Sequence, residues 1–322
     1  MRDVSPVGLT PTAVPHCSKV MKRSVAVCGL TLFLVALADY RVTNSEEHSD
    51  SVKLSLALQS VPKVAYSKNL NRLETQVDYE TASRIHVQIG AEGRWKVPEW
   101  VLPLPQNADS GFAPKYKFSW EENAFSFSVS RLENLEAIFD TRSSPFIFQD
   151  EYIEFSTNLD PTSHVYGLGE HVHSLELKRP LNLTFWALDI PTPPEINLYG
   201  SHPFYMEIRN GVAHGVFLKN SNGMDVQLEE DRLTYRILGG VIDLYFFMGP
   251  TPQDVIKQYW EVIGMPALPP FWSLGWHQCR YGYKVRKSFV ALILMSCSEL
   301  RCSPGSCEKV QGKWASLGWS LV

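Results

Sequence analysis

Apolar and polar residues alternate along short stretches over much of the chain. Ile85, Val87 and Ile89 are separated by more polar residues, and in residues 125–129 phenylalanine and valine alternate with serine. An alternation with a period of two gives a β-strand one apolar face for a core. Such stretches recur from about residue 60 to residue 249 with proline-marked connections between them. The pattern therefore predicts a large antiparallel β-sandwich.

Glycines indicate where some of these strands turn. Residues 233–237 alternate, Gly239-Gly240 follows, and residues 241–248 form a second apolar run. Two consecutive glycines can adopt the positive φ of a tight turn, so we expect a hairpin of these two strands. Asn222-Gly223 predicts another turn. Residues 39–60 are polar and weakly patterned, and are expected as a mature N-terminus ahead of the first strands.

One helix is predicted at residues 252–263. Thr251 is a suitable N-cap, Pro252 suits the first helical position, and Asp254 stands in the first turn. Gly264 ends the segment. The apolar residues at helical spacing are Val255, Ile256, Tyr259, Trp260 and Ile263.

A second domain is predicted to begin after the helix. Pro266, Pro269 and Pro270 form a stiff linker of the kind that separates domains. The apolar and aromatic run at residues 270–283 is typical of a buried parallel strand that leads into a functional loop. The predicted fold class is therefore mainly β: a sandwich with its linking helix at residues 39–265, then one strand of something new at residues 266–284.

Composition identifies a globular protein and excludes two classes of partner. The chain has 322 residues, 44% of them hydrophobic, which suffices for two domains of ordinary size. Its 30 Lys and Arg and 34 Asp and Glu are spread evenly and give a net charge of −4. This balance lacks the basic patch that binds nucleic acid or an anionic membrane, so neither is expected as a partner.

A secretory signal is predicted at residues 21–38. Met21-Lys-Arg-Ser24 is the basic start, residues 25–38 are a short apolar core, and Ala36 and Ala38 fit a cleavage site. The run is shorter than the roughly 20 residues of a transmembrane helix. The alternative is a buried helix or a membrane anchor.

The signal has consequences for the rest of the chain. It makes residues 1–20 an upstream extension and sends the product into the secretory pathway, to the cell exterior, the cell wall, or a vacuolar or lysosomal compartment. Asn182-Leu-Thr184 is a glycosylation sequon in keeping with that route.

Five motifs follow one another between about residues 80 and 284. They are Val165-Tyr-Gly-Leu-Gly-Glu-His171, Leu198-Tyr-Gly-Ser-His-Pro-Phe-Tyr205, Leu218-Lys-Asn-Ser-Asn-Gly-Met-Asp225, Gly239-Gly-Val-Ile-Asp-Leu-Tyr-Phe246 and Trp276-His-Gln-Cys-Arg-Tyr-Gly-Tyr283. In this order they resemble glycoside hydrolase family 31, which includes eukaryotic α-glucosidases and α-xylosidases. The resemblance implies a galactose-mutarotase-like N-terminal sandwich, with residues 266–284 opening a catalytic (β/α)8 barrel.

The resemblance also implies an activity for a complete enzyme, the retaining hydrolysis of terminal α-linked glucosyl residues of oligosaccharides. Such hydrolysis needs two carboxyl groups about 5 to 5.5 Å apart. No residue matches either catalytic motif of the family, so we assign no catalytic residue and expect the chain alone to be inactive. An α-xylosidase and a non-catalytic carbohydrate-binding β-sandwich remain as alternatives.

The resemblance further implies residues that contact substrate. In the family a sandwich loop carries a Trp-Asn-Ala-Asp motif whose aspartate binds sugar hydroxyls. Phe185-Trp-Ala-Leu-Asp189 resembles it, with Ala187 in place of asparagine and Leu188 in place of alanine. A carboxylate accepts strong hydrogen bonds and an aromatic ring covers an apolar sugar face. Trp186, Asp189 and Tyr283 are thus implied as substrate-binding residues; the alternative is a core tryptophan and a solvated turn aspartate.

Other patterns carry little chemistry. Gly167-Leu-Gly169 departs from the dinucleotide fingerprint at its third glycine and predicts a structural turn. His171 and His173 stand without a third ligand, and the cysteine spacing after residue 296 is unlike that of zinc sites. No metal and no cofactor are expected. Residues 285–322 have no period of strand or helix and are interpreted as an unrelated tail, from a retained intron or a frameshift, that ends a truncated chain.

Overall fold

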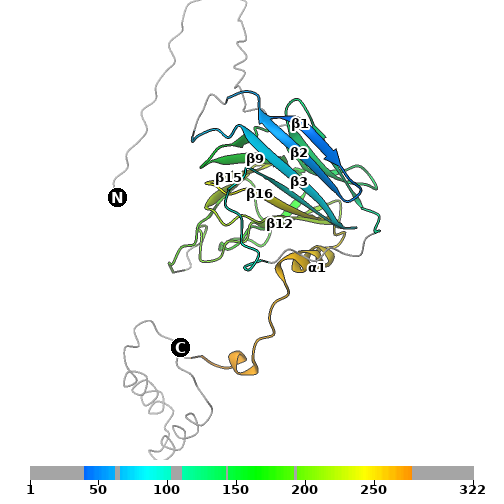
Figure 1. Cartoon of the computed structure of the whole chain (residues 1–322). Helices are drawn as coiled ribbons and strands as arrows, with labels where there is room; N and C mark the ends of the chain where they lie inside the picture. The colour runs from blue at the N-terminus through cyan, green and yellow to red at the C-terminus, as the bar shows by residue number, and fades with distance from the viewer. Residues whose placement is uncertain (1–39, 62–65, 103–110, 143, 192–193, 278–322) are drawn as a thin grey trace, which may run out of the picture. The chain divides into compact units, whose positions relative to one another are not determined.

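The computed structural model describes residues 40–61, 66–102, 111–142, 144–191 and 194–277 (Figure 1). The predicted secretory signal at residues 21–38, the extension at residues 1–20 and the tail at residues 285–322 lie outside these ranges. The chain divides into two units, Met1–Gly264 and Met265–Val322, which are described separately.

The larger layer of the first unit is an eight-stranded antiparallel sheet, whose β1, β2 and β3 lie side by side in Figure 1. One face of this sheet carries the apolar side chains of the main core. Its strands in spatial order are β1 (Tyr40–Glu47), β2 (Ser51–Leu58), β3 (Arg72–Thr81), β4 (Arg84–Gly90), β16 (Ile242–Phe247), β13 (Val212–Leu218), β12 (Phe204–Arg209) and β10 (His164–Gly167).

The opposite layer consists of two smaller antiparallel sheets. The five-stranded sheet has the order β11 (Leu181–Phe185), β14 (Met224–Leu228), β15 (Arg232–Ile237), β9 (Ile153–Asn158) and β8 (Ile147–Phe148). The three-stranded sheet is β5 (Tyr116–Glu121), β6 (Ser126–Arg131) and β7 (Ala137–Asp140). The two sheets meet at β7 and β9, where the Asp140 N–H donates to Thr157 Oγ1 at 2.9 Å. Apolar residues of all three sheets form one core, which confirms the predicted antiparallel sandwich.

The N-terminal segment differs from the prediction. Residues 39–60 were expected ahead of the first strands, but they contain β1 and β2, which pair with each other. Val52, Leu54 and Leu56 alternate with polar residues and are at most 2% exposed. Tyr40 is also buried, and its hydroxyl donates to the carbonyl oxygens of Leu70 and Phe148 at 2.7 and 2.9 Å. The apolar period of two is present here, although the charged residues around it obscure it.

The predicted hairpin around Gly239-Gly240 is wrong. β15 pairs with β14 and β9, while β16 pairs with β4 and β13 in the other layer. The two glycines therefore carry the chain across the sandwich. The Asn220 side-chain amide donates to the carbonyls of Gly239 and Val241 at 3.0 and 2.9 Å. Gly240 has φ 78°, and a Cβ there would lie 2.5 Å from Asn222 Nδ2, so both backbone angle and space require glycine.

The predicted helix is present as α1 (Pro252–Ile263). Thr251 Oγ1 accepts from the Asp254 N–H at 3.2 Å, and the Asp254 carboxylate accepts from the Thr251 N–H, which forms a capping box. The helix covers the second face of the eight-stranded sheet with Val255 and Val262, beside Phe204 and Phe217. Ile263 was expected on this apolar stripe but is 37% exposed; Val262 takes the buried place.

The second unit is described only up to residue 277. Residues 270–283 were predicted as a barrel strand, but Phe271–Leu274 form a 3-10 helix, η1. Within the described part of this unit no strand is present. Phe271 is 91% exposed and Trp276 77% exposed. A catalytic barrel is thus not seen in the described residues.

Candidate functional site

The residues implied in sugar binding lie on the loop that follows β11. Phe185 anchors the loop, since it is buried and lies edge-on against the His171 ring with centroids 5.6 Å apart. The next side chain, Trp186, is 58% exposed, so the alternative of a core tryptophan is wrong. Its indole ring lies against Gly223, where a Cβ would come within 2.4 Å of the ring. Only glycine at position 223, in the predicted Asn222-Gly223 turn, leaves room for the Trp186 ring where it lies.

A second stretch of chain holds the loop in place. The Leu188 N–H donates to the Leu198 carbonyl at 2.9 Å, and Leu198 is buried. The Asn197 side-chain amide donates to the Trp186 carbonyl. These bonds fix both ends of the loop, so that its exposed side chains are carried on a supported backbone.

Asp189 is exposed and has one side-chain partner among the described residues. The Tyr199 hydroxyl donates to Asp189 Oδ1. This hydrogen bond raises the pKa of Tyr199, because the charged acceptor stabilises the protonated phenol. Tyr199 is itself 62% exposed, so its ring and the Asp189 carboxylate face solvent together. We call Trp186, Asp189, Asn197 and Tyr199 the loop cluster.

The turn at Gly167-Leu-Gly169 is hydrogen-bonded, through the next residue, to the stretch that carries Tyr199. Gly167 has φ 103°, and a Cβ there would lie 2.5 Å from the Phe204 carbonyl oxygen, so the predicted structural turn is confirmed. The Gly200 N–H donates to Glu170 Oε2 at 2.8 Å, and the Glu170 N–H donates to the Gly200 carbonyl at 3.1 Å. The turn and the residues after Tyr199 are therefore joined by hydrogen bonds in both directions.

The remaining predicted site residues are less informative. Tyr283 lies outside the described residues. Asn182 is exposed on β11, an edge strand of the five-stranded sheet, and the Thr184 hydroxyl of its sequon donates to Asp225 at 2.7 Å. Both positions stay predictions.

The described ranges hold neither a group of side chains suited to a metal ion nor a helix suited to a membrane. No group of three or more His, Cys, Asp or Glu side chains there is placed to hold a metal ion. The His171 ring nitrogens lie 3.0 and 3.1 Å from the carbonyls of Leu168 and Thr184, which gives this histidine backbone partners. No helix among those residues has the length and apolarity to span a bilayer.

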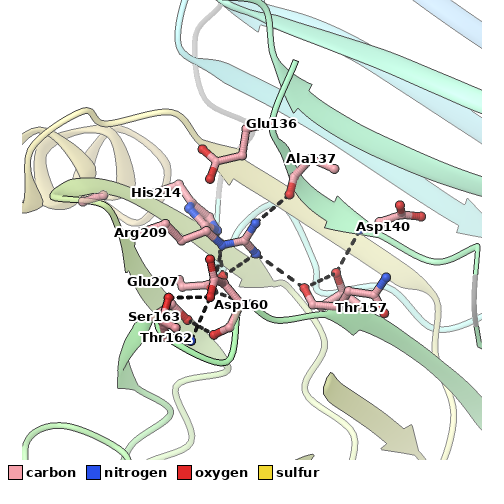
Figure 2. A network of polar contacts seen from close by, with 12 residues as sticks. Glu136, Ala137, Asp140, Thr157, Asp160, Thr162, Ser163, Glu207, Arg209 and His214 are labelled. Carbon is pink, nitrogen blue, oxygen red and sulfur yellow. Dashed lines mark hydrogen bonds and ion pairs between the residues drawn. The ribbon is translucent and has the colours of Figure 1, made fainter. Parts of the chain in front are cut away.

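A second polar group, which sequence reasoning missed, lies inside the sandwich (Figure 2). We call Glu207, Arg209 and His214 the buried polar cluster. Arg209 donates two hydrogen bonds of 2.8 Å to the two carboxylate oxygens of Glu207. It also donates to the Ala137 carbonyl at 2.7 Å, and His214 Nε2 lies 3.3 Å from Glu207 Oε2. The cluster links the eight-stranded sheet to β7 in the opposite layer.

Burial and charge set the ionisation of this cluster. Burial opposes the charged form of Glu207, but the contacts with His214 and Arg209 outweigh it and lower its pKa to about 2. Burial lowers the pKa of His214, against the attraction of Glu207. The folded protein therefore holds an ionised Glu207 beside a neutral His214.

Comparisons with known proteins identify the class first. The sandwich is similar in fold to a solved glucosidase II alpha subunit, with TM-score 0.64 and 18% identity, over 82% of this chain and 38% of that one. It is also similar to a Flavobacterium johnsoniae GH31 dextranase, with TM-score 0.61 and 17% identity over 81% and 32% of the two chains. At this level of identity, these likenesses show a shared fold.

Sequence then gives the family. Residues 94–226 match the glycosyl hydrolase 31 N-terminal galactose mutarotase-like domain, so this region of the chain belongs to that domain family. It is 43% identical over 260 residues to a probable alpha/beta-glucosidase of Arthroderma benhamiae, and 38% identical over 267 residues to an alpha-glucosidase of Schizosaccharomyces pombe. The matches cover 76% of this chain but only 30% and 28% of those relatives.

Proposed function

We propose that the sandwich is the N-terminal domain of an α-glucosidase-type hydrolase, and that its loop cluster forms part of the wall that binds α-linked glucosides. The observation that carries this is an exposed tryptophan and an exposed carboxylate on one supported loop. The names of the relatives, an alpha-glucosidase among them, support the substrate class.

The loop cluster can position a sugar without breaking a bond. The Asp189 carboxylate can accept from a pair of neighbouring sugar hydroxyls, while the Tyr199 hydroxyl keeps one of its oxygens in place. The Trp186 face can cover the apolar face of the ring. In retaining hydrolysis two further carboxyl groups do the chemistry, and a wall of this kind contributes by orientation. Tyr283 would add a second aromatic side chain to it.

The affinity of the 322-residue chain for maltose, measured by calorimetry, tests the proposal. Asp189→Asn should weaken binding tenfold to a hundredfold, because a hydrogen bond to a charged group contributes about 1.5 to 3 kcal/mol. Asp231→Asn is the matched control, since Asp231 is exposed in the turn between β14 and β15. Equal affinities of the wild type and Asp189→Asn, at equal melting temperatures, would contradict the proposal. Stronger binding of a matched α-xyloside would favour the α-xylosidase alternative.

The proposal includes the secretory route. Asn182 stands on an edge strand with its side chain exposed, so an attached glycan would meet no further strand. Expression in a eukaryotic host should give a secreted product that begins after residue 38 and loses mass on deglycosylation. Asn182→Gln should abolish that loss, and an intact N-terminus at Met1 would contradict the route.

A further inference from the structure

A polar cavity lies close to the loop cluster, beside Gly240, where the chain crosses from one sheet layer to the other. Its volume is about 330 Å³, and its lining includes Glu92, Arg94, Trp95, Asp150 and Gly240. Ligand sites in proteins usually have volumes of about 300 to 1,000 Å³. The cavity therefore has room for one small ligand unit. The side chains that line it determine which class of ligand it can bind.

Trp95 forms an aromatic wall with a fixed orientation. The side chain is 56% exposed, and its indole N–H donates to Ser221 Oγ at 3.1 Å. The polar edge of the ring thus has its partner, and the exposed remainder is apolar. Such a half-covered tryptophan offers a flat surface to the C–H face of a ligand.

Arg94 and two carboxylates supply the polar groups. The Arg94 side chain is 9% exposed, and it donates from Nε to the Gly240 carbonyl and from Nη1 to the backbone and carboxylate of Asp150. These three bonds hold the guanidinium in place, and Arg94 is the one positive charge among the residues that line the cavity.

The charges select the class of ligand. Glu92 and the partly exposed Asp150 place two negative charges against the single positive charge of Arg94, so an anion is disfavoured. Carboxylates that accept, a guanidinium that donates and an exposed indole face are the complement of a neutral polyhydroxyl ring. A sugar has both the hydroxyls and the apolar face that this arrangement can bind.

The cavity and the loop cluster both contact one short stretch of chain, residues 221–223. Trp95 contacts Ser221, and Trp186 lies against Gly223 two residues further on. Two residues of extended chain span at most about 7 Å. The two exposed tryptophans therefore stand near enough for one oligosaccharide to touch both.

We infer that the cavity beside Trp95 binds a further sugar unit, beyond the first two, of the same α-glucan chain that the loop cluster binds. The inference rests on the proposed function and specifies its substrate as an oligosaccharide longer than a disaccharide. Once one unit is held at Trp186, the next binding event is intramolecular, so occupancy of the cavity should appear as a gain in affinity with chain length.

Calorimetry with maltose and maltohexaose on the full 322-residue chain tests this. The wild type should bind the hexaose at least tenfold more tightly than maltose. Trp95→Ala should remove most of that gain and leave maltose affinity unchanged, whereas Trp186→Ala should weaken both. Trp95→Phe keeps an aromatic face and should retain most of the gain. The control is Trp100→Ala, at a tryptophan that is 84% exposed outside the cavity lining.

Each outcome has a distinct meaning. A gain with chain length that survives Trp95→Ala, with an unchanged melting temperature, would overturn the inference and leave the proposed function standing. Saturable binding of inorganic phosphate that Trp95→Ala abolishes would overturn the assignment of a neutral sugar. Absence of binding of either saccharide by the wild type would overturn the proposed function, and this inference with it.

Discussion

The buried polar cluster and the loop cluster are built from similar groups and differ in what surrounds them. In the first, Glu207 is 0% exposed and each of its oxygens has a cationic or polar neighbour within the sandwich. In the second, Asp189 stands on a loop with one phenol as partner. A carboxylate whose partners are all internal stabilises a fold. One with an unused oxygen in solvent is available to a ligand.

The largest expected effect comes from breaking the buried cluster. Glu207→Ala leaves the Arg209 guanidinium buried without its counter-charge, which should cost about 3 to 5 kcal/mol of unfolding free energy in urea titrations. Replacing both residues, as Glu207→Leu with Arg209→Leu, should cost less than the single change.

An exposed ion pair supplies the control for that experiment. His164 and Glu176 are 57% and 50% exposed, so Glu176→Gln should change stability by less than about 1 kcal/mol. Equal losses for Glu207→Ala and Glu176→Gln would show that burial does not separate the two kinds of cluster.

The next effect is the pH dependence of stability. Because the pKa of His214 is lowered in the fold, the unfolded chain takes up a proton below the ordinary histidine pKa of about 6.5 while the folded chain does not. The stabilisation that neutral His214 contributes is fully present above about pH 6.5. It is lost as the pH falls below that value, by at most about 1.4 kcal/mol per pH unit.

Glu207 titrates in a separate window. Its folded pKa of about 2 lies below the ordinary value of 4.5, so its contribution is present above pH 4.5 and is lost as the pH falls toward 2. His214→Gln should therefore flatten the pH dependence of the urea midpoint between pH 7 and 5. It should reduce but not abolish the loss below pH 4.5, because Arg209 still lowers the pKa of Glu207. A slope between pH 7 and 5 that survives in His214→Gln would assign that slope to another group.

The smallest effect concerns the loop cluster. Tyr199→Phe removes only the hydrogen bond to Asp189, which leaves the Asp189 carboxylate less well oriented for a sugar hydroxyl. Maltose affinity should fall roughly twofold to tenfold, while the melting temperature stays constant because Tyr199 is exposed. A lowered melting temperature with unchanged affinity would reassign Tyr199 to stability.

Local pattern accounts for what the sequence predicts well. The helix at residues 252–263 was predictable because Thr251, Pro252 and Gly264 act within one or two turns of it. The exposed Trp186 and Asp189 were found only through a family motif, since nothing local distinguishes them from core and turn residues. The motif that contains Tyr199 supported the resemblance, yet its contact with Asp189 depends on how the loop between them folds.

Two of the misses share a cause, the presence of two layers. Residues 204–209 alternate, and the pattern alone would place Glu207 and Arg209 in solvent. In the structure they lie on the face of β12 that meets the opposite layer, while Phe204 and Met206 on the other face pack with residues of α1. In the same way, β15 and β16 are neighbours in sequence and partners of different sheets. The alternation of apolar and polar residues along one strand does not show which sheet the strand joins or which strands of the opposite layer pack against it.

The loop between Trp186 and Asn197 is closed at its base by the bonds from Asn197 to Trp186 and from Leu188 to Leu198. Each doubling of loop length costs only about 0.6 kcal/mol of closure entropy. A longer or shorter loop on the same base should therefore leave the pairing of the sandwich strands unchanged. Transplanting it between two such domains should carry sugar preference with it, which makes this loop a natural unit for engineering.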